Sequence, residues 1–393
     1  MGKNKKQENI FYDPSLKKRH LKASAFKYAA LGSLLISLLF LVVFLSDMVT
    51  KGISAFEQTY IQIEVKYNEK TIKSTRQAID KKYRKLVSRA WLRNIPKQVE
   101  ENPTLMDTTK LIWVLADDQV DMYMKGHYYK LKSKDLKRLE ALIKNNRVEK
   151  KFNTIFFTQG DSKIPEYSGI LSAAVGTILT LLVTMAVAFP IGVATAVYLE
   201  EFANQDSKWS QIIEININNL AAVPSILFGL LGLSIFINLF GFPRSSALVG
   251  GLTLALMTLP IIVVSSRAAL RSVPQSIRQA GYGLGLTKIH VVKDHVLPLA
   301  FPGIMTGSII GLAQAMGETA PLIIVGMIAF IPDSPHTIME ASTVMPAQIF
   351  TWASMPEVAY IERTAAGILV LLTVLITLNA LAVYLRKRFE VKW

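Results

Sequence analysis

The chain has 393 residues, a formal charge of +15 at neutral pH and 51% apolar residues. It has no cysteine, which excludes disulfides, thiol catalysis and thiolate metal sites. A charge this high also occurs in nucleic-acid-binding proteins, but here the apolar residues are concentrated in uncharged segments. Each segment has the length of about 20 helical residues that crosses a hydrocarbon core. We therefore predict an all-α polytopic membrane protein with six transmembrane helices, at residues 28–46, 167–199, 215–243, 245–266, 296–317 and 364–385.

The amino-terminal segment predicts a basic tail, residues 1–27, followed by a retained helix at 28–46. The nineteen uncharged residues of this helix exceed the apolar core of a signal peptide, which is usually about 7–15 residues long. Asp47, Met48 and Val49 follow it and offer no small-residue cleavage site. We expect an anchor that is not removed.

Residues 47–166 form a polar insertion with 24 Lys and Arg against 16 Asp and Glu, a net charge of +8. The alternation in residues 60–67 and the apolar run 111–116 predict strands. Residues 133–145 predict a helix with one apolar face and Ser133 as its N-cap. We expect a small α+β extracytoplasmic domain. It is either a spacer or a docking surface for an extracytoplasmic partner, and the sequence does not separate the two.

Short basic segments set the predicted orientation, because Lys and Arg concentrate on the cytoplasmic side. Residues 1–25 carry seven Lys or Arg, residues 267–295 five, and the end of the chain after 385 four. The short outward loops carry only Arg244 and Arg363. Both termini are therefore expected in the cytoplasm. The transmembrane domain is expected at 167–386, with a cytoplasmic loop at 267–298 and a tail at 387–393.

Prolines and glycines mark breaks and close packing within the predicted spans. Pro190, Pro224 and Pro321 are expected to interrupt the second, third and fifth spans, where neighbouring helices or water can satisfy the freed carbonyls. Gly303, Gly307 and Gly311 form a small-residue ridge that allows another helix to approach closely. This ridge indicates helix packing and not a substrate path.

The glycine-rich stretch "QAGYGLGLTKIHVVKDHVLP", residues 279–298, lies in the basic loop. A channel filter would lie within the membrane behind a pore helix, and a nucleotide-binding loop would need G-x-x-x-x-G-K-[ST], which the chain lacks. We predict two short helices instead. Ser272 caps the first, the glycines at 281–285 end it, and Thr287 caps the second. Such an amphipathic element gives a soluble partner a rigid surface on which to push.

This loop resembles the cytoplasmic loop of ABC-importer permeases, which reads E-A-A, then Gly four residues after the last Ala, then nine residues and I-x-L-P. The matching positions here are Gln279, Ala280, Gly281, Gly285, His295, Val296, Leu297 and Pro298. The spacing, the Gly, the Leu and the Pro match, whereas Gln279, Gly281 and His295 depart from the pattern. Residues 173–203, 219–236, 246–270 and the segment "GETAPL" (317–322) are similar to phosphate-specific permeases of the PstA type.

The resemblance implies a type I ABC importer permease fold in a bacterial cytoplasmic (inner) membrane, with an added amino-terminal extracytoplasmic region. The implied partners are a second permease of the PstC type, two ATP-binding subunits of the PstB type and an extracytoplasmic phosphate-binding protein of the PstS type. The separate ATPase subunits would use ATP, and their closure would move the 272–298 loop. This chain would bind no cofactor and no nucleic acid, and would contact membrane lipids and phosphate.

Gln314, Glu318 and Thr319 are the candidates for the translocation path or its gating. Glu318 lies sixteen residues past Pro302, about 24 Å along a helix and so in the outer half of the bilayer. An ionisable residue inside the membrane usually has a partner and a function. Because a carboxylate repels phosphate, Glu318 is a poor ligand for it. Gating or ion pairing, a helix cap and direct substrate handling remain open. Family members often have Arg at the position of Gln314.

Two other classes of function compete with an ABC permease. A secondary transporter or a channel for an anion would need its own coupling or selectivity site, and the sequence has no internal repeat to supply one. An intramembrane enzyme finds less support, because H-E-x-x-H is absent and all five His lie in polar segments. We therefore assign no catalytic and no metal-binding residue.

Overall fold

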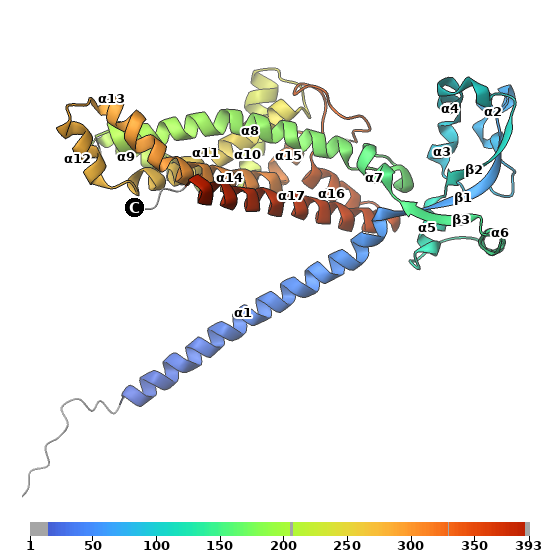
Figure 1. Ribbon diagram of the computed structural model, residues 1–393, viewed down its shortest axis with the longest axis horizontal. Helices are drawn as coiled ribbons and strands as arrows, with labels where there is room; N and C mark the ends of the chain where they lie inside the picture. Colours follow the sequence, from blue (N-terminus) through green and yellow to red (C-terminus); the bar gives the residue numbers. More distant parts are fainter. Residues whose placement is uncertain (1–14, 205–206, 329, 390–393) are drawn as a thin grey trace, which may run out of the picture. The chain divides into compact units, whose positions relative to one another are not determined.

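The computed structural model describes residues 15–204, 207–328 and 330–389 (Figure 1). It divides into two compact units, residues 1–50 and 51–393. The described part of the first unit is helical and forms most of α1 (Leu16–Ile53). Its apolar side chains, including those of the predicted span 28–46, are largely exposed along this helix. The length and hydropathy of α1 are those of a membrane-crossing helix.

The second unit begins with a small α+β domain around a three-stranded antiparallel sheet. β1 (Glu57–Lys66) lies between β2 (Thr109–Leu115) and β3 (Val148–Phe152). Ile61, Ile63 and Val65 alternate onto the buried face of β1 and pack with apolar side chains of the surrounding helices. These helices are α2 (Glu69–Lys73), α3 (Arg89–Arg93), α4 (Ile95–Glu101), α5 (Asp118–Met124) and α6 (Ser133–Lys144).

The strands expected at 60–67 and 111–116 and the helix expected at 133–145 are confirmed as β1, β2 and α6. The predicted cap of α6 is wrong. Lys132 occupies the N-cap position, Ser133 is the first helical residue, and no side chain caps the helix. β3 was not predicted, because "VEKKF" is a short edge strand without a regular apolar alternation.

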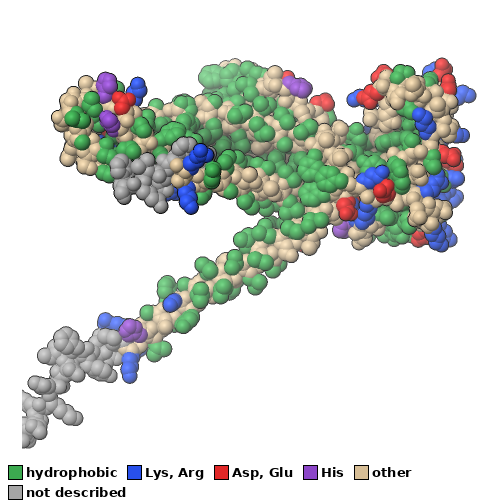
Figure 2. All heavy atoms as spheres, viewed as in Figure 1, with side chains coloured by type: hydrophobic (Ala, Val, Ile, Leu, Met, Phe, Trp, Pro, Cys, Tyr) green, Lys and Arg blue, Asp and Glu red, His purple; other side chains and the backbone are tan. Residues whose placement is uncertain are grey.

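Within the described residues, five helices are long and apolar enough to cross a membrane, or six if one bent pair counts as a span. Beside α1, these are α8 (Leu171–Val197), which continues to Phe202, α11 (Ala247–Arg271), the helix Lys288–Gly317 that contains α14 (Leu297–Gly317), and α17 (Ala359–Phe389). Apolar side chains cover much of the surface of the long helices, whereas Lys and Arg gather on the α+β domain (Figure 2).

The third predicted span, residues 215–243, is not one straight helix. α9 (Lys208–Ala221) and the helix Ser225–Leu239, which begins as α10 (Ser225–Leu231), meet at an angle of 106°. Pro224 precedes α10 with an extended ψ of 135°, and it has no N–H to continue the hydrogen bonds of α9. The proline predicted here as a break therefore acts as one.

The other two prolines differ from each other. α8 runs without interruption through Pro190, so the predicted break there is wrong. The break before Pro321 is confirmed, since α14 ends at Gly317 and α15 (Ala320–Ile324) begins a new helix with Pro321 in its first turn. α15 packs against α10 so closely that a Cβ at Gly229 would lie 2.8 Å from the Pro321 Cα.

α11 is the central helix of the membrane portion and packs against both α8 and α14. The small-residue ridge of α14 makes the second of these contacts. A Cβ at Gly307 would lie 2.1 Å from the Ser265 Oγ, and one at Gly303 would lie 2.7 Å from the Ala269 Cβ. The expected role of the ridge in close helix packing is confirmed. α7 (Thr154–Thr158) and α16 (Met345–Ala353) complete the fold.

Candidate functional site

The loop that follows α11 contains two short helices, as the sequence predicts. α12 (Gln275–Gly283) ends where Gly285 takes a φ of +80°, a conformation that L side chains rarely adopt. The Gly285 N–H donates to the Tyr282 carbonyl, and the Leu286 N–H donates to the Gly281 carbonyl. This is the Schellman pattern of a glycine-terminated helix. Gly285 therefore fixes the turn into α13 (Lys288–His290), which continues through residues 291–296 into α14.

The predicted cap of α12 is wrong, whereas the predicted N-cap position of Thr287 is confirmed. The Ser272 hydroxyl donates to the Ala269 carbonyl of α11 at 2.7 Å, and Pro274 occupies the N-cap position of α12. Thr287 holds the N-cap position of α13, but its hydroxyl contacts the His290 Nδ1 at 2.7 Å and does not cap the backbone. Pro274 has no side-chain acceptor, so α12 starts without a side-chain cap.

Gly281 lies inside α12 and is buried because of a close contact with the next helix. A Cβ at this position would lie 2.7 Å from the Val291 Cγ2. The departure from the second Ala of the family pattern thus brings α12 close to residues 291–296. The two helices form one compact hairpin.

The outer surface of this hairpin is apolar and exposed. Leu284 is 81% exposed, and Tyr282 and Ile289 are exposed beside it. The predicted loop residues Gln279, Ala280, Gly285, His295 and Pro298 are exposed as well, whereas Leu297 is half-buried. Exposed apolar residues beside polar ones are typical of a surface that a partner protein covers.

The hairpin is anchored through Arg278, which is only 8% exposed. Its Nε and Nη2 donate to the two carboxylate oxygens of Glu201 at 3.2 and 2.5 Å. Its guanidinium also donates to the carbonyls of Val273 at 2.8 Å and Leu270 at 3.0 Å. This bidentate pair joins α12 to the end of α8 and fixes both distance and orientation.

A second set of ion pairs lies beside this anchor. Glu200 pairs with Arg271 at 2.8 Å and with Arg267 at 3.4 Å, and Arg267 pairs with Glu214 of α9 at 3.0 Å. These pairs were not predicted from the sequence. The available signal was the adjacent Glu200 and Glu201 directly after an uncharged span, opposite a loop rich in Arg. An open pocket of about 480 Å³ is lined by charged side chains of both sets and by Tyr282, the charged ones being Glu200, Glu201, Arg271, Arg278 and Lys288.

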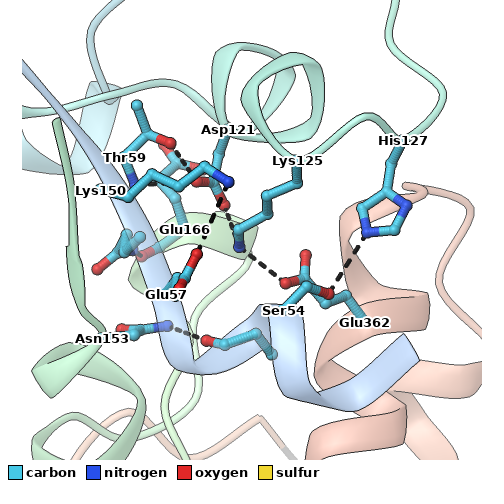
Figure 3. Close-up of polar contacts among 12 residues, drawn as sticks. Ser54, Glu57, Thr59, Asp121, Lys125, His127, Lys150, Asn153, Glu166 and Glu362 are labelled. Atoms are coloured by element: carbon cyan, nitrogen blue, oxygen red, sulfur yellow. Dashed lines mark hydrogen bonds and ion pairs between the residues drawn. The ribbon is translucent and has the colours of Figure 1, made fainter. Parts of the chain in front are cut away.

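At the other end of the long helices, a buried ion-pair group joins the α+β domain to α17 (Figure 3). The Lys125 Nζ lies 2.7 Å from the Asp121 Oδ2 and 2.7 Å from the Glu362 Oε1, and all three side chains are at most 5% exposed. The other oxygen of Asp121 accepts from the Thr59 N–H and hydroxyl at 2.9 and 2.7 Å. An ion pair therefore attaches the α+β domain to the first turn of α17, in addition to the chain connection.

The second predicted set of site residues lies at the far end of α14 from the hairpin, about 30 Å away at 1.5 Å per residue. Gln314 is exposed, and Glu318 and Thr319 are half-buried. Thr319 is the N-cap residue of α15, so the alternative that Glu318 caps this helix is not supported. Among the described residues, no hydrogen bond or ion pair engages the Glu318 carboxylate. Its pairing with another chain stays a prediction.

Comparison with known proteins assigns the two parts of the chain separately. Residues 188–391 match the family described as binding-protein-dependent transport system inner membrane component. Residues 13–92 and 73–133 match a domain of unknown function, DUF3333. The amino-terminal part of the chain through α5 and the permease segment thus match different families.

Two curated relatives and one solved structure illustrate what this chain is similar to. The phosphate transport system permease protein PstA 1 of Mycobacterium tuberculosis is 36% identical over 220 residues, which cover 56% of this chain and 70% of the relative. The probable ABC transporter permease protein YqgI of Bacillus subtilis is 29% identical over 240 residues, 57% of this chain and 81% of the relative. A chain of the MetNI methionine ABC transporter in an inward-facing conformation has 15% identity and a TM-score of 0.44, with 57% and 95% covered.

Proposed function

The chain belongs to the family of binding-protein-dependent transport system inner membrane components, which matches residues 188–391, and we propose that the substrate it carries is inorganic phosphate. It is a multi-pass ABC transporter permease and is not itself catalytic, so an ATPase and a binding protein are its partners. The proposal of phosphate as substrate is supported by similarity to permeases named for phosphate transport, at 36% identity in Mycobacterium tuberculosis and 31% in Mycobacterium leprae.

The proposed complex contains a second permease of the PstC type, two ATPases of the PstB type and a phosphate-binding protein of the PstS type. The ATPases would bind and hydrolyse ATP, and this chain would hold no cofactor. In the proposed orientation both termini and the α12–α13 hairpin face the cytoplasm, while the α+β domain lies outside. The distribution of Lys and Arg in the short loops supports this orientation.

The observation that carries the coupling role is the anchored hairpin with its exposed apolar tip. Leu284 and Ile289 offer an apolar contact for the ATPase, and Arg278 ties the same element to Glu201 of α8. Movement of the hairpin would therefore be transmitted to the helices. A channel filter finds no support here, because the Gly281 and Tyr282 carbonyls already accept the backbone hydrogen bonds that end α12.

Retention of the ATPase tests this coupling role. Leu284→Asp places a charge in the apolar contact and should abolish co-purification of the ATPase with the permease. Leu111→Asp is the matched control, since Leu111 is also exposed but lies on β2 of the α+β domain. Equal retention by both variants would contradict the proposed docking surface.

Orientation is tested independently with single cysteines, because the native chain has none. An impermeant thiol reagent added to intact cells should label Lys70→Cys in the α+β domain and should not label Thr287→Cys in the hairpin. Labelling of Thr287→Cys but not Lys70→Cys would reverse the orientation and remove the cytoplasmic docking role.

A further inference from the structure

The α+β domain carries a strongly basic groove that the transport function proposed above does not use. Two adjoining pockets of about 240 and 700 Å³ form it and share Arg84, Lys85, Lys132 and Asp135. Together the two pockets are lined by nine Lys or Arg and three Asp. The groove therefore concentrates positive charge far above the average of the domain.

The walls of the groove are fixed to the domain core. One wall is the turn at residues 81–86, which ends in the fully buried Leu86. The other wall is the segment that leads into α6. The Arg138 Nη1 of α6 donates to the Lys82 carbonyl at 2.9 Å, and the Lys130 N–H donates to the Gln119 Oε1 at 2.7 Å. The first bond joins the two basic walls despite their repulsion, and the second joins the segment before α6 to α5.

The three acidic groups of the groove are already engaged. Asp135 pairs with Arg138 at 3.1 Å, and Asp80 pairs with Lys82 at 3.4 Å. Asp117 accepts from the Gln119 N–H at 3.2 Å. Burial, together with the neighbouring carboxylates of Asp118 and Glu166, raises the pKa of Asp117 to about 8, so it is largely protonated at neutral pH. The acidic groups therefore do not neutralise the remaining cations.

Those remaining cations lack partners. Within the described residues, the side chains of Arg84, Lys85 and Lys132 make no hydrogen bond or ion pair, and the Arg84 Nε is buried without an acceptor. An acceptor group that enters the groove would complete the hydrogen bonds of the Arg84 guanidinium. Lys132 is also the N-cap residue of the twelve-residue α6, whose first N–H groups have no side-chain cap.

We propose that this basic groove binds a phosphate-type oxyanion on the α+β domain, through the Arg84 guanidinium and the ammonium groups of Lys85 and Lys132. A guanidinium and two ammonium groups match the charge and the acceptor oxygens of such an anion. Clustered positive charge also raises the local concentration of an anion. The inference goes beyond the proposed transport function and does not depend on it, because binding in the groove requires neither ATPase nor uptake.

Equilibrium titration of the full-length chain tests this proposal. The protein is purified in a maltoside detergent, which contains no phosphate, and orthophosphate is titrated against chloride at equal ionic strength. Lys85→Gln with Lys132→Gln should weaken phosphate binding about tenfold or more, since two charge-assisted contacts are lost. The matched control is Lys70→Gln with Lys144→Gln, which removes two exposed lysines outside the groove and should leave the affinity unchanged. Arg84→Gln should weaken binding as well.

Three results would overturn the proposal. They are no saturable phosphate binding by the native chain, an equal loss of phosphate affinity in the two double-lysine variants, or chloride binding as tight as phosphate binding. A lipid headgroup carries the same chemistry, so the titration is repeated in nanodiscs of phosphatidylglycerol. Binding of free phosphate that persists there assigns the groove to the free anion, and binding that is lost there assigns it to the headgroup. Thermal unfolding of each variant checks that the domain still folds.

Discussion

The contact between Arg278 and Glu201 offers the most direct perturbation of the proposed coupling. Arg278→Gln removes a bidentate pair in which Glu201 has a side chain only 5% exposed. The carboxylate would remain buried without a counter-charge, and two carbonyls would lose their donor. Breaking a buried pair in this way costs about 3–5 kcal/mol. At 1.36 kcal/mol per tenfold change, the equilibrium ratio of anchored to detached hairpin should fall by roughly two to four orders of magnitude.

Assays of this variant are phosphate uptake and retention of the ATPase, each normalised to the amount of permease in the membrane. Arg278→Gln should reach the membrane but lose uptake. Arg271→Gln is the control, because Arg271 is 54% exposed and its partner Glu200 keeps Arg267. That change should cost at most about 1 kcal/mol. Replacing both Arg278 and Glu201 with Leu should restore part of the loss. If Arg278→Gln transports as well as Arg271→Gln, the anchoring argument is wrong.

Three further predictions follow from other parts of the structure. Gly285→Val should give a permease that inserts in the membrane but does not retain the ATPase, because a left-handed φ costs a β-branched residue about 1–3 kcal/mol. Normal phosphate uptake by this variant would contradict the prediction. Lys125→Met should lower the free energy of unfolding by about 3–5 kcal/mol, which a lower melting temperature would report. Lys82→Met changes an exposed lysine and should leave the melting temperature unchanged. Gln314→Arg should preserve phosphate uptake when Glu318 is present and should reduce it when combined with Glu318→Gln. Additive effects of the two changes on uptake would show that the two residues do not share a site.

Local features of the fold were predictable because they depend on neighbouring residues. The alternation of Ile61, Ile63 and Val65 identified β1, and the 3.6-residue repeat of leucines identified α6. Gly285 was placed in a turn because glycine alone has no Cβ penalty there. Close packing of a helix at Gly307 was predicted from the recurrence of small residues along one helix face, but the identity of that helix as α11 was not.

Features that depend on distant residues were not predictable from one sequence. Arg278 and Glu201 are separated by 77 positions, and Lys125 and Glu362 by 237, so no local pattern joins them. The prolines illustrate the same limit. Pro224 marks a 106° bend, whereas Pro190 lies in a continuous helix. Proline removes the same hydrogen-bond donor in both places, so the surrounding packing decides whether the helix bends.

ATP-driven uptake of radiolabelled phosphate tests the central claim most directly. The complete complex of this chain, its partner permease and the ATPases is placed in vesicles with the phosphate-binding protein outside and ATP inside. We predict phosphate accumulation that requires ATP, stops with vanadate and is lost in Arg278→Gln. Accumulation that persists with vanadate, or in vesicles that contain this chain without any ATPase, would contradict an ABC permease coupled through the α12–α13 hairpin.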